Sequence, residues 1–431
     1  MNIKRIIIQL LERVEKGEYS QVILDSALKV PGLSEGEKGV CTEIFYGTIR
    51  NKLLLEYCVS KLSNGKVKKS FLKYNLMVAM YQLAFMESKE STVVWEATEE
   101  SKKRFGAVLG KFTNGILRAF ILKKEAMFEE LEVQHNWATR WSYPQWVFEK
   151  LEKQYGDRAV EVLKYYKQIP VMCYRHNGLK GDIKKLESYI KENEFKIQLR
   201  IDNLFYIKNR KLLTSSFMQN SEIVMQDTSS YLAAKLLGAK AGECVLDACA
   251  APGGKTSVLA ENMENLGHID ACELHEERTN TMKFFLMKNG VLNTKVHTLD
   301  ARNVEKLGKT YDKILLDVPC SGLGVLRKKP EILYNRKEED ILELAKIQLE
   351  ILESAAKVLK SGGELVYSTC TLFEEENTEI ILKFLENHKE FSVMKCDLGE
   401  VSSQIDTIGG HYISIENRYL DGFYMIKLIK G

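Results

Sequence analysis

The stretch Ala248–Thr256, which reads ACAAPGGKT, limits what this chain can fold into more than any other. It follows a run typical of a buried strand, Cys244–Ala248, and leads into a predicted helix that begins near Lys255. A Walker A loop needs a glycine, four residues and then Gly-Lys-Ser/Thr, but Cys249 stands at the first glycine position. The GxGxxG dinucleotide fingerprint is absent too. What remains is a strand, a Pro-Gly-Gly turn and a helix N-terminus, over which a nucleotide-like ligand can lie.

The next two predicted strands each end in a carboxylate. Residues Ile269–Cys272 lead to Glu273, 20 residues beyond Gly253, where doubly wound folds place an acid that accepts hydrogen bonds from ribose hydroxyls. The strand Lys295–Leu299 ends at Asp300, which is placed to meet an adenine amino group. Each acid alone is more typical of a solvated strand end, but successive strands ending this way favour an adenosyl ligand. We expect S-adenosylmethionine, a sulfonium cation that carries no phosphate.

Two cysteines follow the last strands of the predicted sheet. The strand Lys313–Leu316 runs into DVPCSG, which contains Cys320, and the strand Glu364–Tyr367 runs into STC, which ends at Cys370. Because the carboxyl ends of parallel strands meet at one edge, both thiols should face the crevice that holds the cofactor.

A thiolate beside a methyl sulfonium has a chemical use. Carbon 5 of a pyrimidine is a poor nucleophile until a group adds covalently to carbon 6, and a cysteine thiolate suits that addition. Asp317, the first residue of DVPCSG, would then contact the cytosine edge, the cofactor or both. The sequence does not separate these roles.

The pattern of apolar and polar residues along the chain predicts three regions. Residues 1–130 read as successive amphipathic helices, and residues 131–225 as a small α+β linker with strands near 171–174, 196–201 and 204–207 and a helix over 182–194. Residues 226–431 alternate strand and helix to the end, starting with a helix over 229–237. This alternation predicts a doubly wound, Rossmann-like parallel sheet.

Charge and cysteine content suggest a partner and a compartment. The net charge is only +3, but residues 1–125 carry 21 Lys and Arg against 14 Asp and Glu. Five lysines lie in an acid-free stretch, at positions 61, 66, 68, 69 and 73. This stretch is either a solvated face or a surface for a polyanion such as RNA. Nine scattered cysteines and the lack of a signal peptide or an apolar span predict a reduced, cytoplasmic protein.

The motifs as a group resemble a known family. DACAAPGGKT, DVPCSGLGVLRKKPEI and YSTCTLFEEEN are similar to the cofactor loop and the two cysteine motifs of the RNA cytosine-5 methyltransferases of the Sun/Fmu group. The resemblance implies that Cys370 is the nucleophile and that Cys320 assists product release. It also implies an S-adenosylmethionine site, whose residues would be Cys249, Ala250, Ala251, Pro252, Gly253, Gly254, Lys255, Glu273, Asp300 and Asp317.

The N-terminal helices resemble a second family. FYGTIRNK, YQLAFM and FTNGILR are similar to the pattern of the NusB-like RNA-binding module. A NusB-like module joined to such a catalytic domain resembles the bacterial RsmB type, which methylates 16S ribosomal RNA. The resemblance implies that 16S RNA, free or in an early assembly intermediate, is the substrate, and we expect the protein to act as a monomer. The alternatives are a non-catalytic RNA-binding assembly factor and an NTPase, which the residue at position 249 disfavours.

Overall fold

The structure of the protein, a computed structural model, describes residues 3–29, 32–413 and 417–431. Its contacts sort the chain into two units. The helical unit runs from the N-terminus to Gln168 and also includes Leu326–Arg336. The sheet unit contains Ile169–Val325 and Lys337–Gly431. Among the described residues, no helix is both long and apolar enough to cross a membrane.

The helical unit is built around α5, which is buried almost all round. Its neighbours are amphipathic: α1 turns Ile7, Leu11 and Val14 into the same core, as expected of helices with one apolar stripe. The prediction that residues 1–130 form successive helices is confirmed for those of them that the structure describes. The helices of this unit are α1 (Ile3–Glu15), α2 (Ser20–Leu28), α3 (Glu35–Arg50), α4 (Lys52–Ser63), α5 (Ser70–Phe85), α6 (Glu90–Phe105), α7 (Ala107–Val133), α8 (Trp137–Arg140), α9 (Gln145–Tyr155), η1 (Gly156–Arg158), α10 (Ala159–Tyr166) and α16 (Ile332–Asn335).

The sheet unit begins with a small four-stranded antiparallel sheet in the order β2-β3-β1-β4. Its elements are β1 (Cys173–His176), α11 (Ile183–Glu192), β2 (Ile197–Ile201), β3 (Leu204–Ile207), η2 (Arg210–Thr214), α12 (Ser216–Gln219) and β4 (Ile223–Met225). The strands and helix expected in the linker region lie within two residues of these positions. The predicted boundaries at 130/131 and 225/226 remain predictions about folding units.

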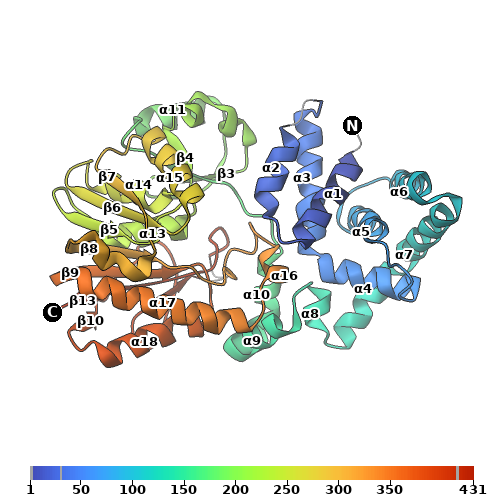
Figure 1. Ribbon diagram of the computed structural model, residues 1–431. Coiled ribbons are helices and arrows are strands. Elements are labelled where there is room, and N and C mark those ends of the chain that lie inside the picture. The colour runs from blue at the N-terminus through green and yellow to red at the C-terminus, as the bar shows by residue number, and fades with distance from the viewer. Residues whose placement is uncertain (1–2, 30–31, 414–416) are drawn as a thin grey trace. The chain divides into compact units, whose positions relative to one another are not determined.

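The large sheet of nine strands has the order β11-β12-β13-β9-β8-β5-β6-β7, and β10 pairs with β13. Figure 1 shows α14 and α15 above these strands and α17 and α18 below them, the two-sided cover of a doubly wound sheet. Its elements are α13 (Thr228–Leu237), β5 (Cys244–Asp247), α14 (Gly254–Asn262), β6 (His268–Glu273), α15 (Glu276–Lys288), β7 (Thr294–Thr298), η3 (Ala301–Leu307), β8 (Tyr311–Asp317), α17 (Glu339–Val358), β9 (Leu359–Thr369), η4 (Glu374–Glu376), α18 (Thr378–Asn387), β10 (Phe391–Val393), β11 (Gln404–Ile405), β12 (His411–Ile413) and β13 (Phe423–Lys430).

The expected parallel sheet is confirmed from β9 to β7 but does not extend to the C-terminus. After α18 the chain returns through β10, β11, β12 and β13, and every pairing among these strands and of β13 with β9 is antiparallel. Short strands joined by loops need no crossover helix, so the strand–helix alternation stops there. The predicted strand over 364–367 is the centre of β9, whose neighbours are β8 and β13.

The small sheet is tied to the start of α14 by the fully buried side chain of Arg175 on β1. Its guanidinium donates to Gln226 Oε1 at 2.6 Å and to Ser257 Oγ at 2.9 Å, and it forms an ion pair with Glu261. Gln226 in turn donates to the carbonyl of Gly254 at 3.1 Å. A buried guanidinium is tolerated only with such partners, so the first turn of α14 has a fixed position against β1.

We predict that Arg175→Met destabilises the protein by about 3 kcal/mol, because it leaves the Glu261 carboxylate without its cation. The matched control is Arg200→Met, which removes a half-exposed ion pair with Glu187 from the same small sheet and should cost under about 1 kcal/mol. Chemical unfolding curves of both variants measure the difference. Equal losses would contradict the anchoring role of Arg175.

Candidate active site

The loop between β5 and α14 has the shape of a cofactor cradle. Gly253 has a φ of +103°, and a Cβ there would lie 3.1–3.2 Å from side-chain atoms of Phe285, Leu286 and Met282. Both the conformation and the lack of space therefore require glycine. The turn closes by a hydrogen bond from the Gly253 amide to the Ala250 carbonyl at 2.7 Å. The first amides of α14 then point toward the carboxyl edge of the sheet.

Asp247, at the end of β5, is fully buried below this loop. Burial raises the pKa of its carboxyl group to about 7, although Oδ2 accepts a hydrogen bond from Thr256 Oγ1 at 2.8 Å. Among the described residues, Oδ1 has no hydrogen-bond partner. The sequence argument did not single out Asp247, although it is the first residue of DACAAPGGKT. A buried acceptor without a donor at this position suits a ligand that brings one.

Lys255 and Asp317 link the cofactor loop to the two neighbouring strands. Lys255 Nζ lies 2.7 Å from Asp317 Oδ2, and Asp317 Oδ1 accepts from Ser368 Oγ at 3.0 Å. Burial alone would lower the pKa of the Lys255 ammonium, but the attraction of Asp317 outweighs it, and the pKa is raised. The Lys255 ammonium therefore stays charged, and the predicted residues from two motifs are in direct contact.

Glu273 is the last residue of β6, and Asp300 lies just beyond β7, as the sequence predicts. Each of the two carboxylates already has a cationic neighbour. Glu273 is buried and accepts from Arg278 Nη1 at 3.2 Å and from the His275 amide at 3.0 Å. Asp300 caps η3 and is bridged by the Arg302 guanidinium, with the shortest contact at 2.7 Å. Their assignment to ribose and adenine stays a prediction.

The two motif cysteines are in contact. Cys320 Sγ and Cys370 Sγ lie 3.1 Å apart, and the Cys370 amide lies 3.3 Å from Cys320 Sγ. Both side chains are partly accessible. The hydrogen bond with Cys370 and burial hold the pKa of the Cys320 thiol well above its usual range. The contact with Cys370 and the burial of Cys320 thus bring two thiols together at this edge of the sheet.

A buried network that sequence reasoning missed holds the two cysteine loops together. The Glu376 carboxylate accepts from the Ser321 amide at 2.8 Å, from Ser321 Oγ and from Gln348 Nε2 at 3.0 Å. Gln348 also donates to the Pro319 carbonyl at 2.9 Å. Burial raises the pKa of Glu376. Glu376 belongs to the motif YSTCTLFEEEN, but three consecutive glutamates look like a solvated turn, and nothing local marks the third as buried.

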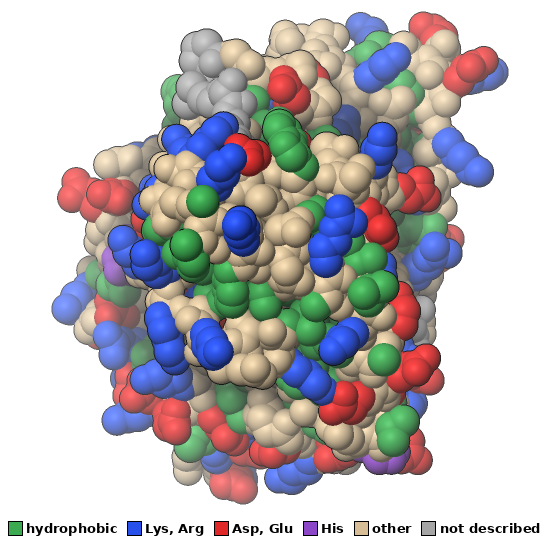
Figure 2. Space-filling view, turned by 90° about the vertical axis from the view of Figure 1, so that its right-hand side faces the viewer, with side chains coloured by type: hydrophobic (Ala, Val, Ile, Leu, Met, Phe, Trp, Pro, Cys, Tyr) green, Lys and Arg blue, Asp and Glu red, His purple; other side chains and the backbone are tan. Residues whose placement is uncertain are grey.

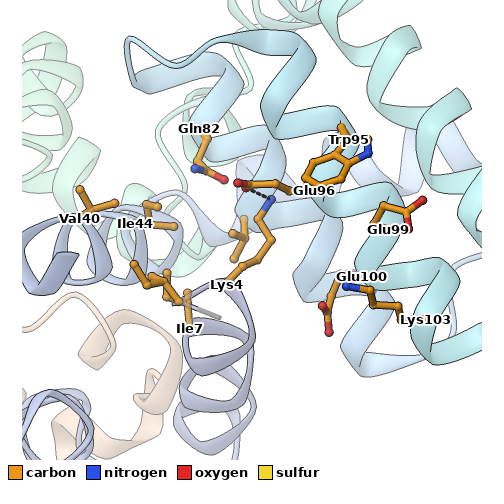
Figure 3. Close-up of a pocket in the computed structure, with 12 residues that line it drawn as sticks. Lys4, Ile7, Val40, Ile44, Gln82, Trp95, Glu96, Glu99, Glu100 and Lys103 are labelled. Carbon is orange, nitrogen blue, oxygen red and sulfur yellow. Dashed lines mark ion pairs between the residues drawn. The ribbon is translucent and has the colours of Figure 1, made fainter. Parts of the chain in front are cut away.

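A separate pocket of about 420 Å³ lies wholly in the helical unit. Figure 3 shows the Lys4 side chain pointing to Glu96, with Trp95, Glu99 and Gln82 around them. The glutamates that line this pocket all have basic partners: Lys4 for Glu96, Lys102 for Glu99 and Arg5 for Glu100. The pocket contains none of the predicted site residues.

Comparisons with known proteins agree with this geometry. Residues 234–429 match the family described as "16S rRNA methyltransferase RsmB/F", and residues 1–122 match the NusB family. A probable ribosomal RNA small subunit methyltransferase B from Bacillus subtilis (strain 168) is 34% identical over 403 residues, which cover 90% of this chain and 89% of that protein. The chain belongs to the RsmB/F methyltransferase family. It is an S-adenosylmethionine-dependent rRNA methyltransferase with a NusB domain.

A further family member and one solved structure match the whole chain, and a second solved structure matches part of it. The ribosomal RNA small subunit methyltransferase B of Yersinia enterocolitica is 30% identical over 443 residues, 100% of this chain and 99% of that one. A crystal structure of a protein called PH0851 is 28% identical, with a TM-score of 0.82 over 100% of this chain and 99% of its own. A methyltransferase homologue from Pyrococcus horikoshii aligns with 69% of the chain at a TM-score of 0.62 and 27% identity.

The residues of the cradle suit the cofactor of this family. S-adenosylmethionine carries hydroxyl and amino donors and a cationic sulfur, and the cradle offers the buried acceptor of Asp247 and the carboxylates of Glu273 and Asp317. The glycine at position 253 keeps side-chain atoms out of the turn. The structure therefore has carboxylate acceptors, rather than an anion-binding cluster, along this edge. Glu273 and Asp317 are among the residues predicted from the sequence, and Asp247 is not.

We predict that an alkylating reagent such as iodoacetamide labels Cys370 faster than Cys320 at pH 7, because only the thiolate reacts and the Cys320 pKa is raised. Labelling of Cys320 should increase as the pH rises through 9. Peptide mass spectrometry measures both rates, with the buried thiols of Cys41 and Cys58 as unreactive controls. Preferential labelling of Cys320 at pH 7 would contradict this order.

Proposed function

We propose that this enzyme methylates carbon 5 of a cytosine in 16S ribosomal RNA, with Cys370 as the covalent nucleophile and Cys320 as the group that assists release. The observation that carries the proposal is the 3.1 Å contact between the two sulfur atoms at the carboxyl edge of the sheet, beside the cofactor cradle. A methyltransferase acting on oxygen or on an exocyclic nitrogen has no need of two thiols in contact. Carbon 5 of cytosine needs a nucleophile and a base.

In the first step the Cys370 thiolate forms a bond to carbon 6 of the cytosine. The electron pair of the C5–C6 double bond moves toward carbon 5, and negative charge that develops on the ring is stabilised by a hydrogen-bond donor at the ring edge. Bound S-adenosylmethionine supplies an electrophilic methyl group. Asp317, fixed between Lys255 and Ser368, is placed to orient the cytosine edge, the cofactor or both.

Release needs a base for the proton on carbon 5. Cys320 lies next to the sulfur that must depart, and its thiolate takes this proton once its own proton has passed to solvent. The freed electron pair restores the C5–C6 double bond, and Cys370 leaves as a thiolate. The raised pKa of Cys320 makes it the stronger base when it is ionised.

The helical unit has exposed basic side chains that suit RNA, but they are not the same set as the five lysines noted in the sequence. Lys61 is paired with Glu130, and Lys73 with Glu15 and Glu56. Lys66, Lys68 and Lys69 remain exposed. A second acid-free stretch, missed in the sequence, is residues 101–124, which contain seven Lys and Arg: 102, 103, 104, 111, 118, 123 and 124.

The two basic stretches meet around a pair of aromatic rings. Phe71 and Phe105 lie edge to face with centroids 6.0 Å apart; Lys69 lies 4.4 Å from the Phe105 centroid and Arg104 lies 4.1 Å from that of Phe71. We call Lys66, Lys68, Lys69, Lys103 and Arg104 the basic surface. Figure 2 looks onto the side where α6 and α7 lie and shows many Lys and Arg side chains across it, with several acids toward its rim. Clustered cations of this kind suit phosphates.

We propose that 16S RNA, free or in an early assembly intermediate, contacts this surface while one unstacked cytosine enters the site of a monomeric, cytoplasmic enzyme. A base inside a duplex cannot reach a thiol at a sheet edge, so a loop or an opened helix is the expected target.

The chemistry is tested on a denaturing gel after incubation with S-adenosylmethionine and unmodified 16S RNA. We expect a protein–RNA adduct to accumulate in Cys320→Ala, which attacks but releases slowly, and none in Cys370→Ala. Dependence of the adduct on Cys320 instead would reverse the two roles. RNA binding without adduct or methyl transfer in the wild type would favour the non-catalytic assembly factor.

The RNA surface is tested with Lys68→Gln/Lys103→Gln. Each lost phosphate contact should weaken binding and lower the slope of log K against log salt by about 1. The matched control is Lys61→Gln, because Glu130 already neutralises that lysine. Filter binding at several salt concentrations gives both quantities. An unchanged slope in the double variant would place the RNA elsewhere.

A further inference from the structure

The C-terminal half of α15 exposes large apolar side chains. Phe284 is 63% exposed, Met287 is 67% exposed, and Leu292, just beyond the helix, is 82% exposed. On the other side of the same helix, Met282 and Leu286 are buried in the core of the sheet unit. A helix that covers one face of a sheet ordinarily has polar residues on its outer side. α15 is apolar on both sides here, and exposed apolar side chains that gather in one place mark an interaction surface.

These side chains line two open hollows that share Met287. One of about 620 Å³ lies between α15 and the chain around α12, and the other of about 390 Å³ lies between α15 and β7. We call the residues Lys180, Lys283, Phe284, Met287, Lys288 and Leu292 the α15 groove. All of them belong to the sheet unit, and α15 lies on the same face of the large sheet as α14 (Figure 1).

One side of the groove is fixed by contacts between the small sheet and the end of α15. The buried Asn177 side chain donates to the Ser221 carbonyl at 2.9 Å and to the Asn289 carbonyl at 3.0 Å. Gly290 has a φ of +78°, and a Cβ there would lie 3.1 Å from Lys180 Cδ. The aliphatic part of Lys180 therefore lies against the turn that follows α15, although the two are more than one hundred residues apart in sequence.

The groove is positively charged. Residues 278–299 contain no Asp or Glu. Among the described residues that line the two hollows, one is acidic, Glu222, and four are exposed lysines, at positions 180, 283, 288 and 295. Lys283 and Lys288 flank Phe284 on the helix, since neighbours in sequence and residues four apart lie close together on its surface. The ring of Phe284 thus lies between cationic side chains.

An exposed aromatic ring among lysines suits a single-stranded nucleic acid. Bases of any identity stack on aromatic side chains, and lysines along the same groove contact the phosphates. A protein partner fits this surface less well, because lysine is depleted at protein–protein interfaces. The charge and the side-chain types of the groove therefore favour RNA.

The position of the groove also fits the substrate of a methyltransferase site on this sheet. α15 begins at Glu276, three residues after Glu273 at the carboxyl end of β6. Phe284 is eight residues further on, which is about 12 Å along a helix axis. An RNA strand with one base at the carboxyl edge of the sheet is long enough to reach the groove.

We propose that the α15 groove binds a single-stranded segment of the substrate RNA, with a base stacked on Phe284 and phosphates at Lys283 and Lys288. The inference rests on RNA as the substrate in the proposed function, and it does not use the roles proposed for the two cysteines. The sheet unit then has an RNA contact of its own, besides the basic surface of the helical unit.

The stacking contact is tested with Phe284→Leu, which keeps an apolar side chain but removes the ring, and Phe284→Tyr, which keeps the ring. We expect Phe284→Leu to weaken the binding of unmodified 16S RNA about tenfold, the size of one lost base stack. Phe284→Tyr should bind within about twofold of wild type. The matched control is Leu342→Ala, which removes an exposed apolar side chain from α17 on the opposite face of the sheet (Figure 1). Filter binding measures all four proteins.

The phosphate contacts are tested with Lys283→Gln/Lys288→Gln. The slope of log K against log salt should fall by about 1.4, as expected for two phosphates of a single strand. Phe284→Leu should leave this slope unchanged, because stacking releases no counterions. The control is Lys346→Gln/Lys357→Gln, two exposed lysines of α17, which should keep the wild-type slope.

Wild-type affinity and slope in the groove variants would overturn the proposal and leave the groove to a protein partner. Equal losses in Phe284→Leu and Phe284→Tyr, or equal losses in the α17 controls, would overturn it as well. The chemistry of the two cysteines is judged separately: a wild-type enzyme that forms no RNA adduct, but whose RNA affinity falls in Phe284→Leu, would contradict that chemistry and support the α15 groove.

Discussion

The parallel pairing of β8 with β5 on one side and β9 on the other is the constraint on which the site depends. It puts the ends of three strands side by side: Asp247 is the last residue of β5, Asp317 is the last residue of β8, and Cys370 follows β9. The Lys255–Asp317 ion pair, the contact of the two sulfur atoms and the Glu376 network all connect loops that leave this one edge. None of these contacts joins residues close in sequence, so each exists only because the strand order is what it is.

The local part of this arrangement could be predicted from the sequence. Strand, loop and helix positions around Ala248–Thr256, and the acids and cysteines that end successive strands, follow from short-range patterns that a buried parallel strand imposes. That the two thiols lie near each other could be predicted, since both motifs follow neighbouring strands of one sheet. The distance of 3.1 Å between their sulfur atoms could not.

The other contacts depend on residues distant in sequence, which local sequence patterns do not identify. Glu376 is buried because Gln348 and Ser321 reach it from other elements, and Lys61 and Lys73 are neutralised by glutamates 69 and 58 residues away. The antiparallel strands after α18 break the strand–helix alternation, and Leu326–Arg336 belongs to the helical unit although its neighbours in sequence belong to the sheet unit. Contacts between distant segments decide all of these, and hydrophobic periodicity reports only which face of an element is buried.

The anchoring of α14 by Arg175 has a consequence for how the domain unfolds. Because the guanidinium bonds β1 to the first turn of α14 through Gln226 and Ser257, the small antiparallel sheet cannot open without freeing the cofactor loop. The two should therefore behave as one cooperative block in hydrogen exchange, with amides of β1 and of α14 protected to the same degree. The small sheet therefore supports the cofactor loop from outside the large sheet. The residue that makes this support, Arg175, lies more than seventy residues before the loop in sequence.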